Sequence, residues 1–598
     1  MAELLNGQKR THMCGELSTA HVGQEVTLMG WVHRRRDLGG LIFLQLRDRS
    51  GISQVVFDTD VCTKDLLEKA STIKLEYVVS VVGKVRMRVG NNINRNMKTG
   101  EIEVVAEQLA ILSEADTTPF SVGDDGANES LRLKYRYLDL RREKLQYNLV
   151  TRSKICQITR NYLADLGFLE IETPMLGKST PEGARDYLVP SRVHPGSFYA
   201  LPQSPQIYKQ LLMIGGMDRY FQIAKCFRDE DLRANRQPEF TQIDLEMSFV
   251  DQEEEVMTVT EGLLRKMFKE IRNVDLPEKF LRMPWKQAMD LYGSDKPDLR
   301  FGLEIQNLDE TVKDSSFVVF QNALKDGGTV RAIVLPEGAD KLSRKDLDKL
   351  VDFVKTYRAK GLAWYGLGKD GTKCSFAKAV TAEELQAISN ALNMKQGDIA
   401  LIVADSSWNT AVVSLGALRC HLASKFQLYK AGDFAALWVV DFPLFEYSEE
   451  EQRYVAMHHP FTSPKNEDLQ YMRSHPSRVR AKAYDVVING DEIGGGSMRI
   501  YNRDVQKLMF ETLGFSDEQI ADRFGFFVDA FKYGTPPHGG LALGLDRLVM
   551  VLTDTLNIKD VIAFPKMQNA SCMMTEAPSP VDDKQLDELK IKCEEQDD

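Results

Sequence analysis

One short stretch, FQIAKCFRDEDLRANRQPEFTQIDLEMSF (221–249), places an arginine beside two acids and then adds further arginines. Arg228 directly precedes Asp229 and Glu230, and a polar loop follows. Arginine forks match phosphate oxygens bidentately, and carboxylates hold such an arginine in place or recruit a metal ion. The stretch therefore predicts a site for phosphate groups.

Two further motifs support this interpretation. GGLALGLDRLVMVL (539–552) combines small residues, which allow close backbone approach, with Arg547 one turn into an apolar helix. A charged side chain there is costly unless it is paired or faces a polyanion. PMLGKSTPEGARDYLV (174–189) predicts an extended segment and a loop rich in proline and glycine. Each of these two is weak alone, but the three motifs in this order are specific.

The end of the first stretch predicts the strand that would position such a site. Polar residues, including Asp244 and Glu246, alternate there with apolar ones, so one face of the strand would be wholly polar. A solvated face of an antiparallel sheet gives the same pattern, but the neighbouring arginines favour a binding surface.

Residues 1–112 read as a small β-domain. Five short alternating runs are separated by turn residues, and a helix at 64–72 precedes the fourth run, which predicts a closed OB-fold barrel. Strand count alone leaves a purely structural β-domain equally open. Three arginines (34–36) near Trp31 and Phe43 favour binding of single-stranded nucleic acid, in which aromatic rings stack on bases.

Composition sets the broad class. Apolar residues make up 43% and charged residues 27%, as in ordinary globular proteins, which excludes collagen-like and wholly disordered chains. The net charge of −11 indicates that the surface as a whole is not basic. Residues 1–110 alone are slightly basic, with 15 basic and 13 acidic residues.

The cysteines and the N-terminal sequence bear on location. Eight scattered cysteines fit neither a zinc site nor a disulfide framework. No secretory signal or membrane-spanning run is evident, so a cytoplasmic location without membrane contact is expected.

With these motifs in hand, the chain resembles the class II aminoacyl-tRNA synthetases, and among them the bacterial-type aspartyl-tRNA synthetases, over essentially its whole length. GFLEIETPML resembles the family's first motif, around Pro174, FRDE…RQPEFTQID its second, and GLALGLDR its third. The resemblance implies an α+β multidomain fold: an OB-fold that reads the anticodon, an antiparallel sheet with flanking helices, and an inserted α+β domain of the GAD type. It also implies a homodimer formed through the first motif.

The expected organisation follows from this resemblance together with local sequence character. It comprises an anticodon-binding domain (1–112), a connector (113–147), a first catalytic part (148–299), an inserted domain (300–430), a second catalytic part (431–566) and a C-terminal extension (567–598).

The resemblance also implies site residues. The ATP-binding set would be Arg228, Asp229, Glu230, Gln237, Glu492, Gly544, Leu545, Asp546 and Arg547, with Arg228 and Arg547 catalytic. Mg²⁺ would be held by Asp485 and Glu492, whose oxygen ligands suit a hard cation. L-aspartate would be bound by Glu182, Gln206, Lys209, Arg228, Asp244, His458 and Arg499, although His459 competes with His458 for its role. Arg36, Phe43 and Gln54 would contact the anticodon loop.

The implied reaction is ATP-dependent activation of L-aspartate to aspartyl-AMP, followed by transfer to the 3′ end of tRNA(Asp). Leu38 stands where relatives that also charge tRNA(Asn) tend to carry histidine, which favours a discriminating enzyme; a form that charges both tRNAs is the alternative. QSPQIYK (203–209) resembles the family's aspartate-specific loop. Because this loop, the barrel and both arginines, Arg228 and Arg547, are present, the weaker alternatives are an asparaginyl- or lysyl-tRNA synthetase, a tRNA-independent amide synthetase and a non-catalytic paralogue.

Overall fold

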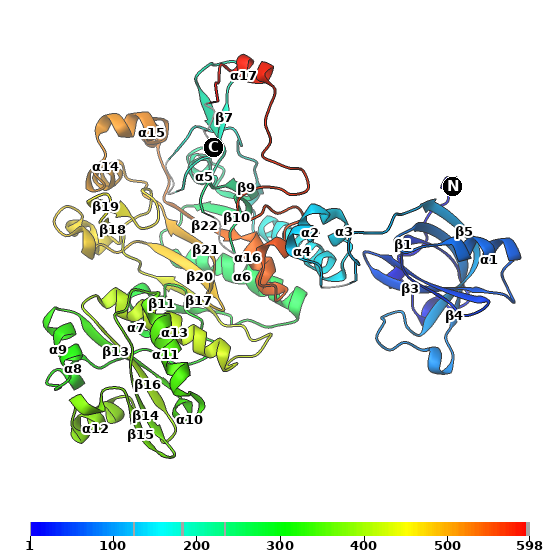
Figure 1. The fold of residues 1–598 in the computed structure, drawn as a ribbon. Coiled ribbons are helices and arrows are strands. Elements are labelled where there is room, and N and C mark those ends of the chain that lie inside the picture. Colours follow the sequence, from blue (N-terminus) through cyan, green and yellow to red (C-terminus); the bar gives the residue numbers. More distant parts are fainter. Residues whose placement is uncertain (1, 124–125, 181–183, 232–234, 594–598) are drawn as a thin grey trace. The chain divides into compact units, whose positions relative to one another are not determined.

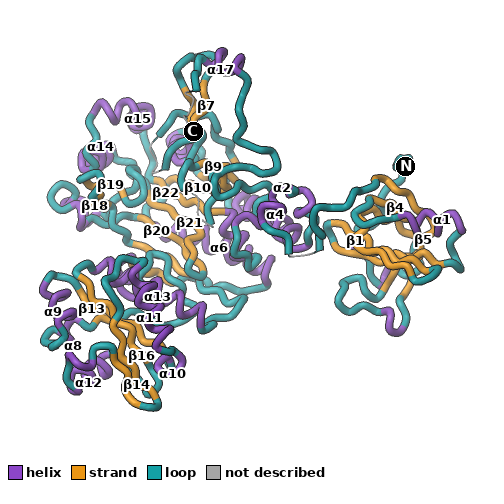
Figure 2. The backbone as a smooth tube through the Cα atoms, in the orientation of Figure 1, coloured by secondary structure: helices purple, strands orange, loops and turns teal. Residues whose placement is uncertain are grey.

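The computed structural model describes residues 2–123, 126–180, 184–231 and 235–593. Contacts divide the chain into two compact units, residues 1–152 with 559–580 and residues 153–558 with 581–598. Each unit is described below by itself, and Figures 1 and 2 show the elements of both.

The first unit begins with a closed five-stranded barrel of order β1-β2-β3-β5-β4. Its strands are β1 (Glu25–Asp37), β2 (Leu41–Asp48), β3 (Gly51–Asp58), β4 (Val78–Met87) and β5 (Ile102–Ser113). Helix α1 (Lys64–Thr72) precedes β4 and is capped by the Thr63 side chain, which accepts from the backbone N–H of Leu66. The predicted OB-fold is confirmed, because the strand number and the place of the helix both agree.

Alternation explains why these strands close into a barrel. Along β2, Ile42, Leu44 and Leu46 point into a buried core, whereas Phe43 and Gln45 stay half-buried on the outer face. The basic and aromatic side chains of this region therefore remain outside the core.

The rest of the first unit is helical, with α2 (Glu129–Lys134), α3 (Arg136–Asp139) and the start of α4 (Glu143–Asp165). Arg136 is 2% exposed and donates to the backbone carbonyls of Lys559, Ile562 and Ala563. This bonding fastens residues 559–580 to the unit. Helix α4 begins at Glu143, directly after α3 and the turn at 140–142.

A mostly antiparallel eight-stranded sheet forms the centre of the second unit. Its strands, in spatial order, are β11 (Leu281–Pro284), β17 (Ala436–Val440), β20 (Ala483–Ile488), β21 (Asp491–Met498), β22 (His538–Gly544), β10 (Glu239–Ser248), β9 (Arg219–Phe227) and β6 (Leu169–Glu170). Within the described strands of this sheet, only the edge pairs β11–β17 and β6–β9 are parallel. Glycine lets β21 and β22 approach closely, because a Cβ on Gly496 would lie 2.1 Å from the Gly540 carbonyl oxygen.

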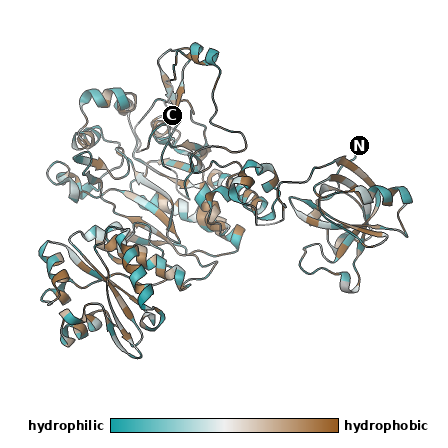
Figure 3. Ribbon diagram, viewed as in Figure 1, coloured by the Kyte–Doolittle hydropathy of each residue, from teal (hydrophilic) through white to brown (hydrophobic). Residues whose placement is uncertain are grey.

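Helices pack on this sheet through apolar faces, coloured brown in Figure 3. The main ones are α5 (Gln206–Ile214), α6 (Glu253–Arg272) and α16 (Leu545–Leu552). Helix α6 buries one side completely, including Leu263, Leu264 and Phe268. The predicted combination of an antiparallel sheet and flanking helices is confirmed.

Between β11 and β17 the chain forms a second, five-stranded sheet of order β12-β13-β16-β14-β15. The strands are β12 (Gln306–Asn307), β13 (Thr329–Leu335), β14 (Ala363–Gly368), β15 (Gly371–Cys374) and β16 (Ile399–Asp405). Its helices are α8 (Asp309–Val312), α9 (Val318–Lys325), α10 (Gly338–Lys341), α11 (Arg344–Lys355), α12 (Ala382–Ala391) and α13 (Trp408–Lys425). Separate apolar cores on its two faces bury the sheet, as expected for the α+β module at about 300–430.

Smaller elements complete the second unit. They are β7 (Leu188–Pro190), β8 (Phe198–Ala200), α7 (Trp285–Tyr292), β18 (Phe445–Ser448), β19 (Arg453–Ala456), α14 (Arg503–Thr512), α15 (Asp517–Ala530) and α17 (Asp583–Leu589). The C-terminal extension (567–598) thus contains one short helix, α17, which has no buried residue. Among the helices of the described chain, none is both long and apolar enough to cross a membrane.

Candidate active site

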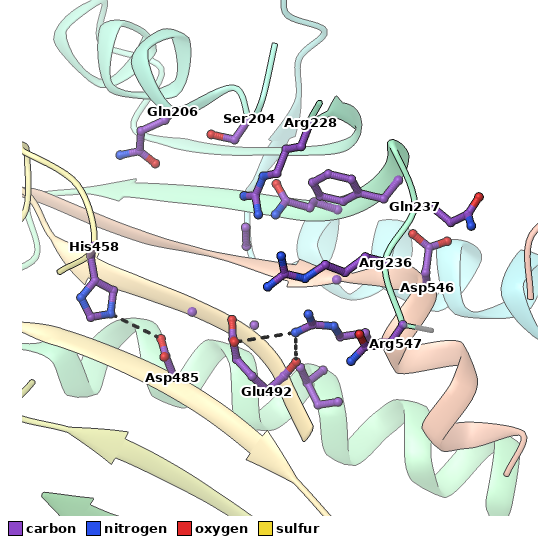
Figure 4. A pocket seen from close by; sticks show the side chains of 18 of the residues that line it. Ser204, Gln206, Arg228, Arg236, Gln237, His458, Asp485, Glu492, Asp546 and Arg547 are labelled. Atoms are coloured by element: carbon purple, nitrogen blue, oxygen red, sulfur yellow. Dashed lines mark hydrogen bonds and ion pairs between the residues drawn. The ribbon is translucent and has the colours of Figure 1, made fainter. Parts of the chain in front are cut away.

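A cavity of about 370 Å³ lies over the central strands of the eight-stranded sheet. The loop between β9 and β10, strands β20 and β21, and the junction of β22 with α16 supply most of its wall, as Figure 4 shows. Two of the three motifs, residues 221–249 and 539–552, thus meet around one cavity, whereas no described residue of 174–189 belongs to its lining.

Arg228 enters the cavity from the end of β9 and stacks over the Phe240 ring, with 5.1 Å between guanidinium carbon and ring centroid. No ion pair joins it to another described residue, and its buried Nε has no hydrogen-bond partner there. Arg236 differs, since its Nη1 donates to Glu230 Oε2 at 2.9 Å. Arg228 is therefore available for an anion in the cavity.

Arg547 reaches the cavity from the first turn of α16 (Figure 4). Its Nη1 donates to the backbone carbonyl of Glu492 at 2.8 Å and lies 3.7 Å from the Glu492 carboxylate. The Asp546 carboxylate accepts from the Thr241 backbone N–H at 3.0 Å, which fixes the start of the helix against β10. A second guanidinium is thus held in place over the sheet.

Two carboxylates, Asp485 on β20 and Glu492 on β21, line the same cavity. Gly495 makes room for the Asp485 side chain, because a Cβ there would lie 2.2 Å from Asp485 Oδ1. Burial and the nearby Asp485 charge raise the pKa of Glu492, against the opposing effect of Arg547. A bound cation would relieve this repulsion. Within the described ranges, no group of three or more His, Cys, Asp or Glu side chains forms a metal centre by itself.

Behind the cavity wall, two cations and two carboxylates form a buried cluster. Lys209 Nζ donates to Asp244 Oδ1 at 2.6 Å and lies 3.3 Å from Glu246 Oε2. Arg499 binds both Glu246 oxygens, at 2.9 and 3.1 Å. Each of the four side chains is at most 2% exposed. Burial raises the pKa of Asp244, whereas Arg499 and Lys209 overcome burial and lower that of Glu246.

His459 connects this cluster to the cavity. Arg499 Nη1 donates to its Nε2 at 2.7 Å, and the ring lines the cavity wall. His458 also lines the cavity and lies 3.9 Å from Asp485. Burial and the Arg499 charge hold the pKa of His459 well below its usual range, so the ring is neutral and accepts at Nε2.

From the low pKa of His459 we expect the folded protein to lose stability in acid. In the unfolded chain His459 takes up a proton below about pH 6.5, whereas the folded ring beside Arg499, Lys209 and His458 does not. The free energy of unfolding should therefore decrease as pH falls from about 6.5. His459→Gln keeps an acceptor for Arg499 and should flatten this decrease in urea unfolding measured at several pH values. His475→Gln, at an exposed position, is the control, and an equal effect there would contradict the role of His459.

The structure brings together many of the expected site residues and sets others apart. The cavity is lined by Gln206, Arg228, Glu230, Gln237, His458, Asp485, Glu492, Gly544, Asp546 and Arg547. Outside its lining lie Asp229, Lys209, Asp244, Arg499 and Leu545. Glu182 falls outside the described residues.

Sequence reasoning did not assign Glu246 a role. It is 0% exposed and binds both buried cations, and its alternation with Asp244 on one strand face was the available signal. Gly540 opposite it accommodates the side chain, since a Cβ there would lie 2.0 Å from Glu246 Oε2. Phe240, beneath Arg228, had no sequence signal of its own.

The expected anticodon residues share the outer face of the barrel. Arg36 on β1 pairs directly with Phe43 on β2, and Gln54 on β3 pairs with Gln45. Gln54 donates to Glu103 at 2.9 Å. Leu38 follows β1 and is 68% exposed. The arrangement provides an accessible aromatic ring beside a cation, which suits base stacking.

Comparisons with known proteins agree with this geometry. A family model described as "tRNA synthetases class II (D, K and N)" matches residues 128–568, and one described as "OB-fold nucleic acid binding domain" matches residues 26–112. A relative from Lachnoclostridium phytofermentans named "Aspartate--tRNA(Asp/Asn) ligase" is 57% identical over 99% of this chain and 98% of its own. One from Clostridium perfringens named "Aspartate--tRNA ligase" is 56% identical over the same shares.

Solved structures show the same fold. An asparaginyl-tRNA synthetase from Pyrococcus horikoshii complexed with asparaginyl-adenylate has a TM-score of 0.58 at 18% identity, over 93% of this chain and 98% of that one. A putative aspartyl-tRNA synthetase from Leishmania major gives 0.59 at 21% identity, over 94% and 96%. Together with the family models and the near-full-length relatives, the barrel, the sheet and its cavity establish that the chain belongs to the class II tRNA synthetases of the D, K and N group.

Proposed function

We propose that this protein is an aspartate--tRNA ligase, which activates L-aspartate with ATP and transfers it to the 3′ end of tRNA(Asp). The observation that carries the proposal is a cavity with two guanidinium groups, Arg228 and Arg547, over an antiparallel sheet, backed by a cluster that contains Lys209 and Arg499. Relatives of more than half identity carry the corresponding ligase names.

The two arginines suit the chemistry of adenylate formation. The aspartate carboxylate attacks the α-phosphorus of ATP in line, pyrophosphate leaves, and the tRNA ribose hydroxyl later attacks the acyl carbon and releases AMP. Neither step needs an enzyme nucleophile, so positioning and charge neutralisation supply the catalysis. Arg228 would hold the α-phosphate and the reacting carboxylate, and Arg547 the γ-phosphate.

Further lining residues would place the nucleotide and its metal ion. Glu230, Gln237, Gly544 and Asp546 would surround ATP, with Asp229 and Leu545 supporting that wall. Asp485 and Glu492 would hold Mg²⁺, which supplies charge neutralisation on the phosphates when bound.

Selection of aspartate would depend on the buried charges beside His459. Lys209 and Arg499 present donors only, so the amide group of asparagine would face donors with its own N–H groups. Gln206, His458 and Asp244 would complete the amino-acid site, with Glu182 as a further proposed ligand for the ammonium group.

A homodimer through the first motif belongs to the proposal. Strand β6 is an edge of the eight-stranded sheet, and apolar side chains in and after it are exposed, among them Leu169 (51%) and Leu176 (51%). An apolar edge of this kind suits a partner subunit. The proposal places the enzyme in the cytoplasm, where charged tRNA is used.

The decisive experiment measures aspartate-dependent exchange between ATP and pyrophosphate, without tRNA. The expected result is exchange with L-aspartate and not with L-asparagine or L-lysine, and exchange only with another amino acid would overturn the substrate. Purified tRNA(Asp) and tRNA(Asn) are then charged side by side. Leu38 favours a form specific for tRNA(Asp), whereas one relative is named as a ligase for both tRNAs. Aspartylation of both tRNAs would identify the non-discriminating form.

A further inference from the structure

The turn between β20 and β21 lies next to the acidic pair of the cavity. It consists of Asn489 and Gly490, both with positive φ (57° and 86°), and β21 begins directly after it. Glu492, whose carbonyl binds Arg547, therefore stands two positions beyond Gly490. Any displacement of this turn moves Glu492 and the guanidinium that it holds.

The chain that leads into the inserted module contacts this turn from one side. A Cβ on Gly490 would lie 3.0 Å from Cβ of Asp298, so the two segments are in tight contact. Arg300 fixes the Asp298 carboxylate, with guanidinium–oxygen distances of 2.6 to 3.2 Å. Arg419, on α13 of the module and 1% exposed, donates to the Asp298 and Phe301 carbonyls at 2.5 and 2.9 Å.

The chain that leaves the module also contacts this turn. The Asn489 side chain donates to the Asp433 carbonyl at 3.0 Å and accepts from the Ala435 N–H at 2.9 Å. The two connections also contact each other, because Arg300 stacks over the Tyr429 ring at 3.9 Å. The turn is therefore clamped between the entry and the exit of the module.

We propose that the two connections to the inserted module hold the β20–β21 turn and so position Glu492 and Arg547 for the phosphates of ATP, with Asn489 and Arg419 as positioning residues. This inference rests on the proposed function for the identity of the nucleotide. The inserted module would then act on nucleotide binding at the cavity without contributing a side chain to it.

The test uses the full-length protein with Asn489→Gly. Glycine accepts the positive φ, so the substitution removes the two side-chain hydrogen bonds and keeps the turn. Asn393→Gly is the matched control, because Asn393 has φ of 50° and is exposed inside the module. Tyr429→Leu is the second variant, and it removes the ring that links the two connections.

The expected result for Asn489→Gly is an increase of roughly threefold to tenfold in both the Kd for ATP, measured by calorimetry, and the KM for ATP in exchange. The KM for aspartate should change less than about twofold, Tyr429→Leu should act in the same direction, and the control should match the parent. Equal changes in both KM values, or an unchanged ATP Kd, would overturn the inference. A parent protein that binds ATP but shows no exchange with aspartate would instead overturn the proposed function, and the calorimetric comparison would still decide the inference.

Discussion

Alanine in place of Arg547 should lower aspartate-dependent ATP–pyrophosphate exchange at least about 100-fold, since a single preorganised donor at developing charge is worth about 10²–10³ in rate. The guanidinium is held over the cavity by the Glu492 carbonyl at 2.8 Å, so in the proposed role it would meet the phosphates of ATP without reorganising. Lysine should restore only part of the activity, because it cannot reproduce the planar fork. The measurement is the rate of ATP–pyrophosphate exchange at saturating aspartate, for both Arg547→Ala and Arg547→Lys.

The same variants should bind tRNA(Asp) almost as tightly as the parent, because the proposed anticodon residues lie on the barrel. Arg473→Ala removes an arginine whose side chain is 76% exposed and serves as the control for loss of one positive charge. If tRNA affinity fell as far as exchange, or if the Arg473 variant lost comparable activity, the role assigned to Arg547 would be wrong.

The barrel was predictable from local pattern alone. Its strands alternate inward apolar and outward polar residues, and α1 begins at a threonine cap, so neighbouring residues carry the whole signal. The presence of Arg228 and Arg547 at one cavity was predictable from their short motifs, and their role toward phosphate groups stays a prediction.

The environment of the polar face of β10 was not predictable. A strand face that carries Asp244 and Glu246 is typical of a sheet surface exposed to solvent. Both residues are nevertheless 0% exposed. Their partners, Lys209 and Arg499, are far away in the sequence, and no local pattern indicates which cations neutralise them. The clamp on Asn489 is a similar case, since it depends on two connections that only the folded chain brings together.

Lys209→Met should have the second large effect, on both stability and activity. The substitution removes one of two buried cations and leaves Asp244 without its partner at 2.6 Å. Breaking a buried ion pair from one side costs about 3–5 kcal/mol, because an uncompensated charge remains in the interior. Urea unfolding of the full-length protein should show this loss as a lower free energy of unfolding for the unit that contains the eight-stranded sheet. ATP–pyrophosphate exchange with aspartate should disappear.

Loss of activity in that variant would not distinguish a substrate-binding lysine from a structural one, and a double variant does. Lys209→Met with Asp244→Asn leaves Glu246 with Arg499, one carboxylate with one guanidinium, and should recover much of the unfolding free energy. Because Asp244 is itself proposed for the amino-acid site, Asp244→Asn alone is the reference for exchange. If Lys209 helps to bind the aspartate side chain, the double variant shows much less exchange than Asp244→Asn although its fold is restored. If the double variant shows as much exchange as Asp244→Asn, Lys209 serves only to neutralise Asp244, and selection of aspartate depends on Arg499 and its neutral partner His459.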